Sequence, residues 1–530
     1  MKVFKSLFFF LFSFLSFSQT DGSLDTNFNT DGYVSIPYPN VSGVYPTFVE
    51  ELNDGSYIVG VNTNQQNKAK QAFLTKFNPD GSLDVSFGDN GRLIFSTINE
   101  EDGSYSINTL YSIHRLNSQE LIIAGIIEDK QTFIKIDNDG NFISNYGGLG
   151  FKTISEGKLG THQALLSDGK IIAATTFKID SLNVFRNNFS KYTVNGHLDS
   201  GFGTNGSLVL DITEQNIDMF SKVVDYSPNS FIAVGNSMPY ISYDTGFIAK
   251  FNYDGSYDSN FGQYGVITMD YPFLGQYTTL NDMVIQHDKK ILVCGISLFN
   301  GGTGGGNYFA SVPLIARFNA DGSLDSTFGN NGFFMNSSAL FGANERYQKI
   351  TLLPDNKILV LGTSSLPFPF MKTAVIVRRF NADGSPDLSF GNNSYFHYLN
   401  DNNANFTEAN SGLSIQVLEN NKIIVLARHR RHEVPWEGRM FRLHVNFLSQ
   451  NNFSDSSITY YPNPVKDVLN ITSANNIERV YVYSTNGRLV KIEENFDSST
   501  LDLSDLISGS YLLILYDNNS NKKVIKVIKD

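Results

Sequence analysis

A short glycine-rich motif recurs along most of the chain, and its regular spacing limits the folds that the chain can adopt. The copy at residues 78–91 reads NPDGSLDVSFGDNG, and the sequence contains seven related copies. Successive motif glycines are 59, 59, 56, 59, 67 and 62 residues apart, counted through Gly22, Gly81, Gly140, Gly196, Gly255, Gly322 and Gly384. A period this regular indicates a repeat architecture.

Each repeat contains apolar runs that suit four short strands. Asp80 and Gly81 predict a turn, because Gly tolerates positive φ and Asp accepts local backbone hydrogen bonds. Strands are predicted at residues 91–95 and, in the first repeat, at 46–52, 57–60 and 72–78. The run at 57–60 recurs in every repeat and is apolar on both faces, which predicts a strand buried on both sides. The run at 72–78 alternates polar and apolar residues, so we expect it nearer a sheet edge.

Four strands in each of about seven repeats favour blades arranged around a central axis. A linear β-solenoid is the alternative, but it needs atypical capping repeats, and the sequence contains no obvious caps. The first motif copy has no strand before it, and the last strand, at residues 441–446, has no motif after it. We therefore predict an all-β fold in which the N-terminal copy, around Leu24 and Phe28, completes the last blade of a closed seven-bladed β-propeller.

The repeat unit FNxDGSLDxxFGxxG resembles the delta-60 repeat, a bacterial β-propeller-like repeat, over residues 21–448. The resemblance implies a surface or secreted propeller without a general catalytic site. Its structural positions are the seven glycines above and the phenylalanines Phe28, Phe87, Phe202, Phe261, Phe328 and Phe390. The third copy departs most, because it lacks the second acid and has Tyr146 in place of Phe.

The N-terminal residues 1–18 have the pattern of a signal peptide. Lys2 and Lys5 precede an apolar stretch at 7–17, which is too short to span a bilayer comfortably. No later stretch is long and apolar enough either, so we expect no transmembrane segment in the mature chain. The propeller domain is expected at residues 19–448.

The formal net charge of −12 and the cysteine count exclude several classes of function. An acidic chain without a basic stripe is a poor nucleic-acid binder. Cys294 is the only cysteine and lies in an apolar strand, so a disulfide framework is impossible and a buried, unreactive thiol is expected.

After a polar linker at residues 449–458, the pattern changes to short antiparallel strands that predict a small β-sandwich at 459–530. This segment resembles the type A C-terminal sorting domain of the type IX secretion system. The matching positions include Tyr461, Pro462, Asn463, Pro464, Asn486, Gly487, Gly509 and Tyr511. The resemblance implies export to the surface or medium of a Bacteroidota-type bacterium and contact with the type IX secretion machinery. An accessory immunoglobulin-like module is the alternative.

The repeated acids suggest a calcium loop, but turn-forming Asp and Asn explain the motif without a metal, and we expect no cofactor. His429, His432 and Glu433 could approach a transition metal, although a solvated loop is the simpler interpretation. The segment GFGTNG at 201–206 superficially matches a dinucleotide fingerprint, but it is a repeat copy without a following helix. No catalytic constellation stands apart from the repeats.

We therefore expect a monomeric, non-enzymatic binding platform, secreted or held on the outer-membrane surface, whose ligand is a glycan or a surface protein. Trp436, the only Trp, lies in a basic, non-repeated segment at 428–438 and is the leading candidate for ligand contact, with His429, His432 and Tyr264. A surface polysaccharide-degrading enzyme is the alternative. It would require two acids, or an acid and a His, that converge outside the repeated positions.

Overall fold

The computed structural model describes most of the chain between residues 20 and 530. The described ranges are 20–36, 43–64, 71–95, 108–127, 130–146, 150–154, 162–179, 184–210, 216–239, 245–269, 277–300, 309–335, 344–365, 372–399, 408–418, 421–431, 435–446, 458–473, 477–484, 489–494, 496, 499–517 and 522–530. The predicted signal peptide at 1–18 and most of the predicted linker lie outside them.

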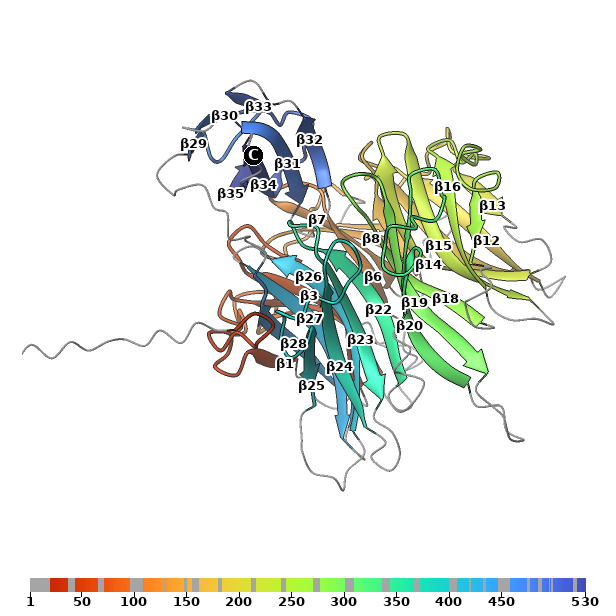
Figure 1. Ribbon diagram of the computed structural model, residues 1–530. Helices are drawn as coiled ribbons and strands as arrows, with labels where there is room; N and C mark the ends of the chain where they lie inside the picture. Colours follow the sequence, from red (N-terminus) through yellow and green to blue (C-terminus); the bar gives the residue numbers. More distant parts are fainter. Residues whose placement is uncertain are drawn as a thin grey trace, which may run out of the picture.

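In the described ranges, the strands before residue 447 group into seven four-stranded antiparallel units, which we call blades 1 to 7 (Figure 1), and a single parallel bridge between Thr245 and Thr278 joins blades 4 and 5 into one sheet. Blades 1 to 3 consist of β2 (Gly43–Glu51), β3 (Tyr57–Asn64), β4 (Ala72–Phe77) and β5 (Arg92–Phe95); β6 (Thr109–Arg115), β7 (Glu120–Ile127), β8 (Lys130–Asp137) and β9 (Phe151–Thr153); and β10 (His162–Leu165), β11 (Ile171–Ile179), β12 (Val184–Tyr192) and β13 (Ser207–Leu210). Blades 4 and 5 consist of β14 (Asn216–Ser227), β15 (Ser230–Pro239), β16 (Thr245–Asn252) and β17 (Val266–Thr268); and β18 (Tyr277–Ile285), β19 (Ile291–Asn300), β20 (Phe309–Phe318) and β21 (Phe333–Met335). Blades 6 and 7 consist of β22 (Asn344–Leu352), β23 (Ile358–Ser365), β24 (Thr373–Phe380) and β25 (Tyr395–Tyr398); and β26 (Glu408–Leu418), β27 (Lys422–Arg431), β28 (Glu437–His444) and β1 (Tyr33–Ile36).

The first strand of each blade contacts the first strand of the next, and the series β2, β6, β10, β14, β18, β22 and β26 returns to β2. The ring is closed by the N-terminal strand β1, which is the outermost strand of blade 7. Tyr33 lies opposite Phe441 in the β1–β28 pair, and Leu24 forms an isolated bridge with Leu443. The predicted closure of the propeller by its N-terminal segment is therefore confirmed.

The second strand of each blade is buried on both faces, as predicted, because its alternate side chains enter two different interblade cores. In β3, Ile58 packs with Phe87 and Leu121 between blades 1 and 2, whereas Val59 packs with Ile424 between blades 7 and 1. Cys294 occupies such a position in β19 and is buried, as expected, and burial raises the pKa of its thiol.

The third strands are more deeply buried than their polar–apolar alternation predicted. All side chains of β4 are buried, including Lys76, although β4 neighbours the short outermost strand β5. In every blade except blade 2, the third strand carries a cation that pairs with an acid of a motif loop, so alternation here does not indicate contact with solvent. Lys76, for example, pairs with Asp84.

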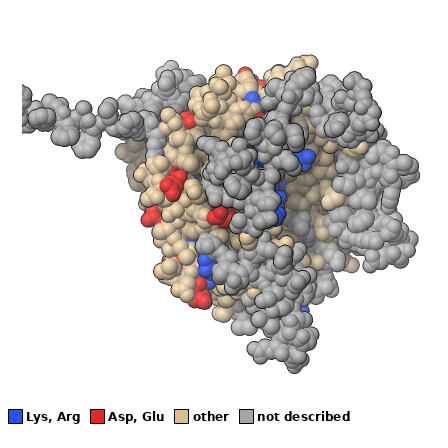
Figure 2. Space-filling model, turned by 90° about the horizontal axis from the view of Figure 1, so that it is seen from below, with Lys and Arg blue, Asp and Glu red and all other residues tan. Residues whose placement is uncertain are grey.

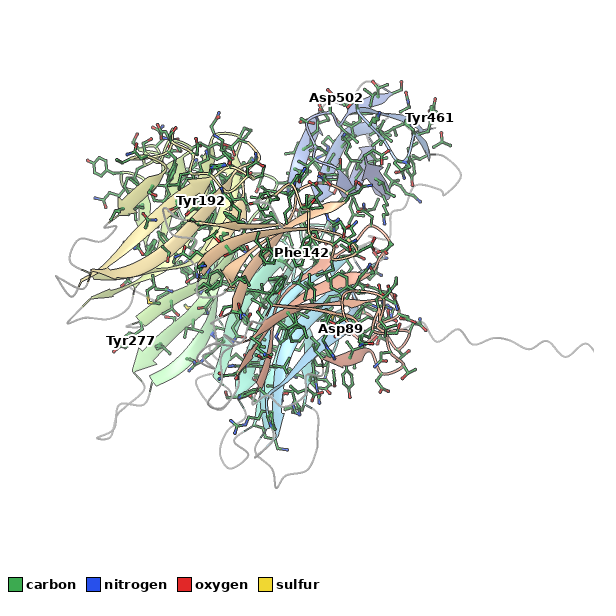
Figure 3. All side chains as sticks on the ribbon, turned by 180° about the vertical axis from the view of Figure 1, so that it is seen from behind. Asp89, Phe142, Tyr192, Tyr277, Tyr461 and Asp502 are labelled. Carbon is green, nitrogen blue, oxygen red and sulfur yellow. The ribbon has the colours of Figure 1, made fainter. Side chains whose placement is uncertain are left out.

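The C-terminal domain is a β-sandwich, as predicted, and appears beside the propeller in Figure 3, where Tyr461 and Asp502 mark it. One sheet contains β29 (Ile458–Tyr461), β30 (Val468–Ser473) and β33 (Thr500–Asp502). The other contains β31 (Ile477–Ser484), β32 (Leu489–Glu494), β34 (Gly509–Asp517) and β35 (Lys522–Lys529). Leu469, Val480 and Leu513 belong to the core shared by the two sheets.

Candidate binding sites

The first acid of the motif forms a local turn. The Asp80 carboxylate accepts hydrogen bonds from the Ser82 backbone N–H at 2.9 Å and the Ser82 hydroxyl at 2.7 Å. These bonds hold the pKa of Asp80 below its ordinary value. The same pair of bonds recurs at Asp254, Asp321 and Asp383. The turn interpretation of the motif therefore accounts for one oxygen of each of these carboxylates.

The second acid of the motif pairs with the cation of the preceding third strand. Arg317 Nε lies 2.7 Å from Asp325 Oδ2, and Arg317 Nη1 donates to the Ala382 carbonyl of the next blade at 2.6 Å. Burial favours protonation of Asp325, but hydrogen bonds from Thr327 and Lys290 and the charge of Arg317 hold its pKa well below the usual range. Because the cation bonds to its own blade and to the next, it joins adjacent blades. Equivalent acid–cation pairs are Asp84–Lys76, Asp199–Lys191, Asp258–Lys250, Asp387–Arg379 and Asp25–Arg442.

In blade 2, the cation of the third strand also forms an ion pair, but its acidic partner comes from the second strand instead of the motif loop. The motif copy of blade 2 has Ile143 where the other copies have the second acid, and Lys135 instead pairs with Glu120 at 2.7 Å. Glu120 occupies the position immediately before the apolar run of the second strand. Blades 3, 5, 6 and 7 have a lysine at this position, for example Lys170 in blade 3. The departure of the third copy from the motif is thus compensated within its own blade.

The motif glycines and phenylalanines of successive copies lie against one another. Gly81 has a φ of 87°, and a Cβ placed on it would lie 2.9 Å from the Phe28 ring. Gly140 and Gly384 stand in the same relation to Phe87 and Phe328. These positions therefore have a structural role in joining the blades.

Trp436 lies half-buried at the entry to β28 and is flanked by arginines. The Arg428 guanidinium lies 4.5 Å from the centre of the Trp436 ring, and that of Arg430 lies 5.8 Å from it. The Trp436 carbonyl accepts from Val44 N–H at 2.8 Å, which joins this segment to blade 1. Arg428 Nε is buried and has no acceptor in the described part of the chain. We call Arg428, Arg430 and Trp436 the Trp436 patch.

The other predicted contact residues are placed differently. His429 is buried on β27, and its Nδ1 lies 2.6 Å from Asn410 Oδ1, so it does not belong to an exposed loop. Residues 428–431 continue a strand whose alternate side chains face the interblade core, which explains this difference from the prediction. His432 and Glu433 lie outside the described residues. Tyr264 is 80% exposed in a motif turn of blade 4.

A second group of polar residues lies on the innermost strands, where the sequence interpretation placed no site. It contains His114, His162, Lys222, Asp282 and Lys349, one from each of blades 2 to 6, and we call it the central cluster. Lys222 Nζ lies 3.7 Å from Asp282 Oδ1, and Asp282 Oδ2 accepts from Ile350 N–H at 3.1 Å. An alignment of the first strands would have placed four of these residues in one column.

The histidines of the central cluster are neutral at pH 7. Burial, together with the charge of Lys222, lowers the pKa of His114 to about 4. Burial and the charges of Lys349 and Lys222 lower the pKa of His162 to about 4, against an opposing effect of Asp282. Because charged groups from three other blades influence His162, the cluster acts as one electrostatic unit around the axis of the ring.

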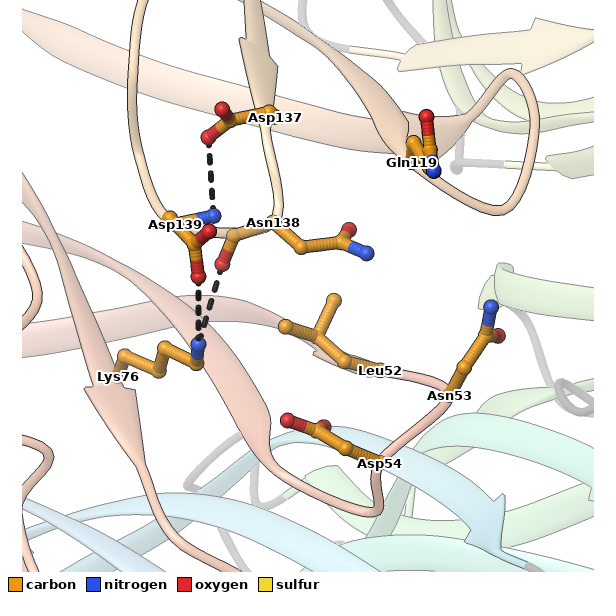
Figure 4. A pocket seen from close by; sticks show the side chains of 8 residues that line it. All are labelled: Leu52, Asn53, Asp54, Lys76, Gln119, Asp137, Asn138 and Asp139. Atoms are coloured by element: carbon orange, nitrogen blue, oxygen red, sulfur yellow. Dashed lines mark hydrogen bonds and ion pairs between the residues drawn. The ribbon is translucent and has the colours of Figure 1, made fainter.

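A cavity of about 470 Å³ opens between blades 1 and 2 and is lined by Leu52, Asn53, Asp54, Lys76, Gln119, Asp137, Asn138 and Asp139 (Figure 4). Lys76 Nζ donates to the Asn138 carbonyl at 3.2 Å and lies 3.6 Å from Asp139 Oδ1. At the corresponding place between blades 3 and 4, the Tyr253 ring lies 4.2 Å from Lys191 Nζ. Blade 2 has Asn138 at the position that Tyr253 occupies in blade 4.

The C-terminal domain contacts the propeller at hairpins of distant blades. Ser510 Oγ donates to Asn53 Oδ1 of blade 1 at 3.4 Å, and the Tyr481 ring lies 5.3 Å from that of His287 of blade 5. Within the domain, Asn463 bonds to Ile528 N–H and the Lys526 carbonyl, and Tyr511 Oη donates to the Ile507 carbonyl. Tyr461 is exposed, and Asn486 and Gly487 lie outside the described residues.

Acidic side chains are scattered singly over the described surface in Figure 2. Among the described residues, no three His, Cys, Asp or Glu side chains form a group that could hold a metal ion. The same residues include no helix long and apolar enough to cross a membrane.

Comparisons with known families identify both parts of the chain. A model described as the secretion system C-terminal sorting domain matches residues 459–530. A model described as a domain of unknown function (DUF5122) beta-propeller matches residues 52–87, 166–202, 286–328 and 353–390. The sorting domain indicates that the protein is secreted or displayed at the cell surface. No curated relative matches this chain.

Several solved structures share a distant likeness with it. A protein of unknown function from Dyadobacter fermentans is 10% identical over 78% of this chain and 98% of its own, with a TM-score of 0.37. Drosophila Semaphorin 1a, extracellular domains 1-2, is 10% identical over 78% of this chain and 88% of its own, with a TM-score of 0.39. Prolyl oligopeptidase B from Galerina marginata is 11% identical over 82% of this chain and 56% of its own, with a TM-score of 0.37. Likenesses this weak carry no argument about function.

Proposed function

Because the chain is a β-propeller protein with a type IX secretion C-terminal sorting domain, we propose that it is a non-enzymatic binding platform outside the cell. The observation that carries the proposal is the Trp436 patch, in which a half-buried indole is flanked by two guanidinium groups at 4.5 and 5.8 Å. The repeated acids, cations, glycines and phenylalanines hold the ring together. The patch, in contrast, occurs once.

The chemistry of the patch suits a glycan that carries carboxylate groups. An indole face can bury the apolar face of a sugar ring, and a guanidinium fork pairs with a carboxylate through two hydrogen bonds. Arg430 is exposed beside the indole, so its guanidinium is accessible to the carboxylate of a ligand. The secretion machinery is the second partner, recognised through the C-terminal domain.

The experiment is a titration of intrinsic fluorescence with neutral and uronate-containing oligosaccharides, preceded by a glycan array. Trp436 is the only tryptophan, so its emission reports this patch alone. Arg430→Gln should weaken binding of acidic glycans about tenfold, whereas Lys130→Gln, on an exposed position of blade 2, should leave it unchanged. An array without any bound glycan, or binding on the array that Trp436→Ala does not alter, would contradict the proposal.

A polysaccharide-degrading enzyme is the second candidate, and the central cluster is the observation that favours it. Asp282 and His162 are a non-repeated acid and histidine whose charges interact. Hydrolysis of any surface polymer that is lost in both Asp282→Asn and His162→Gln would favour this candidate. Three further predictions remain: the signal peptide at 1–18, the Bacteroidota source and the monomeric state. Light scattering after size-exclusion chromatography tests the monomeric state.

A further inference from the structure

The strongest unassigned feature is one equivalent position in the first strand of each blade. Its residue lies opposite the fourth residue of the apolar run in the second strand, for example Lys222 opposite Val234 and Asp282 opposite Cys294. In blades 3 to 6 this position holds His162, Lys222, Asp282 and Lys349. In blades 7, 1 and 2 it holds Ser414, Phe48 and Ser112. At this level of the ring, the side chains of blades 3 to 6 are therefore ionisable, and those of blades 7, 1 and 2 are not.

The charges at this level do not balance. Asp282 is buried, and its two oxygens face Lys222 Nζ and Ile350 N–H. Lys349 is only partly buried, and the described residues include no hydrogen bond or ion pair to its Nζ. With His114 and His162 neutral, two lysines stand against one carboxylate. A lysine held in a partly desolvated position without an acceptor is costly unless an anion pairs with it.

We propose that the central cluster binds an oxyanion, namely the sulfate, phosphate or carboxylate group of a ligand, between Lys349 and Lys222. The groups that surround this place come from five blades and include two histidines that can donate N–H bonds. Ser112 already bonds to the Gln163 side chain and lies 3.2 Å from His114 Nε2, which holds that ring in place. The oxyanion would supply the acceptor that Lys349 lacks.

The rest of the protein makes this site distinctive. The chain carries a net charge of −12, so its overall field repels anions, and binding requires a local excess of positive charge. Blades 3 to 6 supply such an excess at one level of the ring. The proposed site is built from the first strands of blades 3 to 6, whereas the residues of the Trp436 patch belong to the second and third strands of blade 7 and the turn between them.

The test is calorimetric titration of the full chain with sulfate, phosphate and galacturonate at constant ionic strength. The anion that binds identifies the source of the oxyanion. Lys349→Met should weaken binding at least tenfold, whereas Lys130→Met, which removes an equal charge from an exposed position in blade 2, should change it less than twofold.

Ser414→Asp provides a second variant that leaves every residue of the cluster in place. It adds a negative charge at the equivalent position of blade 7 and should also weaken binding at least tenfold. Arg430→Gln should leave the affinity unchanged, which separates this site from the Trp436 patch. Absence of binding for all three anions, or equal affinity in the wild type, Lys349→Met and Ser414→Asp, would overturn the proposal.

Discussion

Arg442 and Asp25 are 417 positions apart in the chain, and Arg442 Nε donates a hydrogen bond to Asp25 Oδ2 at 2.8 Å. Asp25 is fully buried and also pairs with Lys422 at 2.6 Å. Hydrogen bonds from Lys422 and the charge of Arg442 lower the pKa of Asp25 despite the opposing effect of burial. The acid–cation pair that occurs within blades 1, 3, 4, 5 and 6 therefore joins the two ends of the propeller in blade 7.

Replacement of Asp25 should destabilise the closed ring. Asp25→Ala leaves Arg442 and Lys422 partly buried without their carboxylate, and loss of one partner from a buried pair costs about 3–5 kcal/mol. Urea unfolding would measure the change. The matched control is Asp80→Ala, since Asp80 is an exposed first acid of the motif, and it should cost less than about 1 kcal/mol. Equal effects of the two substitutions would mean that the Asp25–Arg442 pair does not add to the free energy of unfolding.

The compensated pair in blade 2 predicts a rescue. Glu120→Lys places a second cation beside Lys135 and should lower the free energy of unfolding by about 1–3 kcal/mol. Adding Ile143→Asp restores the arrangement found in blades with a lysine at this position, such as Lys170 with Asp199 at 2.7 Å. The double variant should therefore recover most of the lost stability, and a double-mutant cycle measures the coupling. Additive losses would contradict the interpretation of Glu120 as a substitute for the missing acid.

The two half-buried histidines of the central cluster, His114 and His162, predict a loss of stability in weak acid. The pKa values of His114 and His162 fall from 6.5 to about 4 on folding, so between these pH values only the unfolded chain binds the two protons. The free energy of unfolding should therefore decrease as the pH falls from 6.5 to 4, by about 2–4 kcal/mol for the pair.

His397 and His444 also have lowered pKa values and act in the same direction, so the comparison must be with a variant. The pKa values of motif acids such as Asp325 and Asp387 are lowered from 3.8. These acids therefore change the stability mainly below pH 3.8, outside the range from pH 6.5 to pH 4. The double variant His114→Gln/His162→Gln should flatten the pH dependence of urea unfolding. A slope that persists unchanged in this variant would show that the two histidines are protonated in the folded protein.

Removal of calcium should leave the propeller intact. The first acids of four motif copies use one oxygen for a serine turn, and the second acids pair with lysine or arginine. We expect the melting temperature in excess EDTA to match that in millimolar calcium chloride. A fall in melting temperature that calcium reverses would instead assign a metal to the motif loops.

The contact between the C-terminal domain and the propeller predicts local protection of the hairpins that it touches. Hydrogen exchange at residues 52–56 and 286–290 should be faster in a chain truncated at residue 458 than in the full chain. The hairpin at 166–170 of blade 3, whose Ser167 bonds to Asp225 and Tyr253 of blade 4, serves as the control. His287→Ala in the full chain should reproduce the faster exchange at 286–290. Exchange rates that are the same in the truncated and the full chain would contradict this contact between the domain and the propeller.

Much of the fold could be predicted because it depends on local patterns. The motif spacing, the doubly apolar second strands and the unpaired N-terminal copy together indicated a ring closed by residues near Leu24. Gly81 and its counterparts marked turns with positive φ that few other residues adopt. The sandwich at 459–530 and its sorting-domain resemblance likewise followed from short motifs.

The partners of individual polar side chains could not be predicted in this way. Polar residues in the third strands suggested an edge near solvent, yet Arg379 is buried and pairs with Asp387. His429 followed a basic run that suggested a loop, yet it lies on a strand within the core. The central cluster was missed because its members are about 60 residues apart and have no shared motif.

The sequence by itself determined the repeated unit, its turns, the closure of the ring and the C-terminal sorting domain. Each of these depends on backbone preferences and burial patterns that act over a few residues. Only the tertiary structure decided which charges meet, as in Arg442 with Asp25 or Lys222 with Asp282. The physical reason is that contacts between blades depend on the curvature of the whole ring, which brings one strand position from every repeat to the same level around the axis.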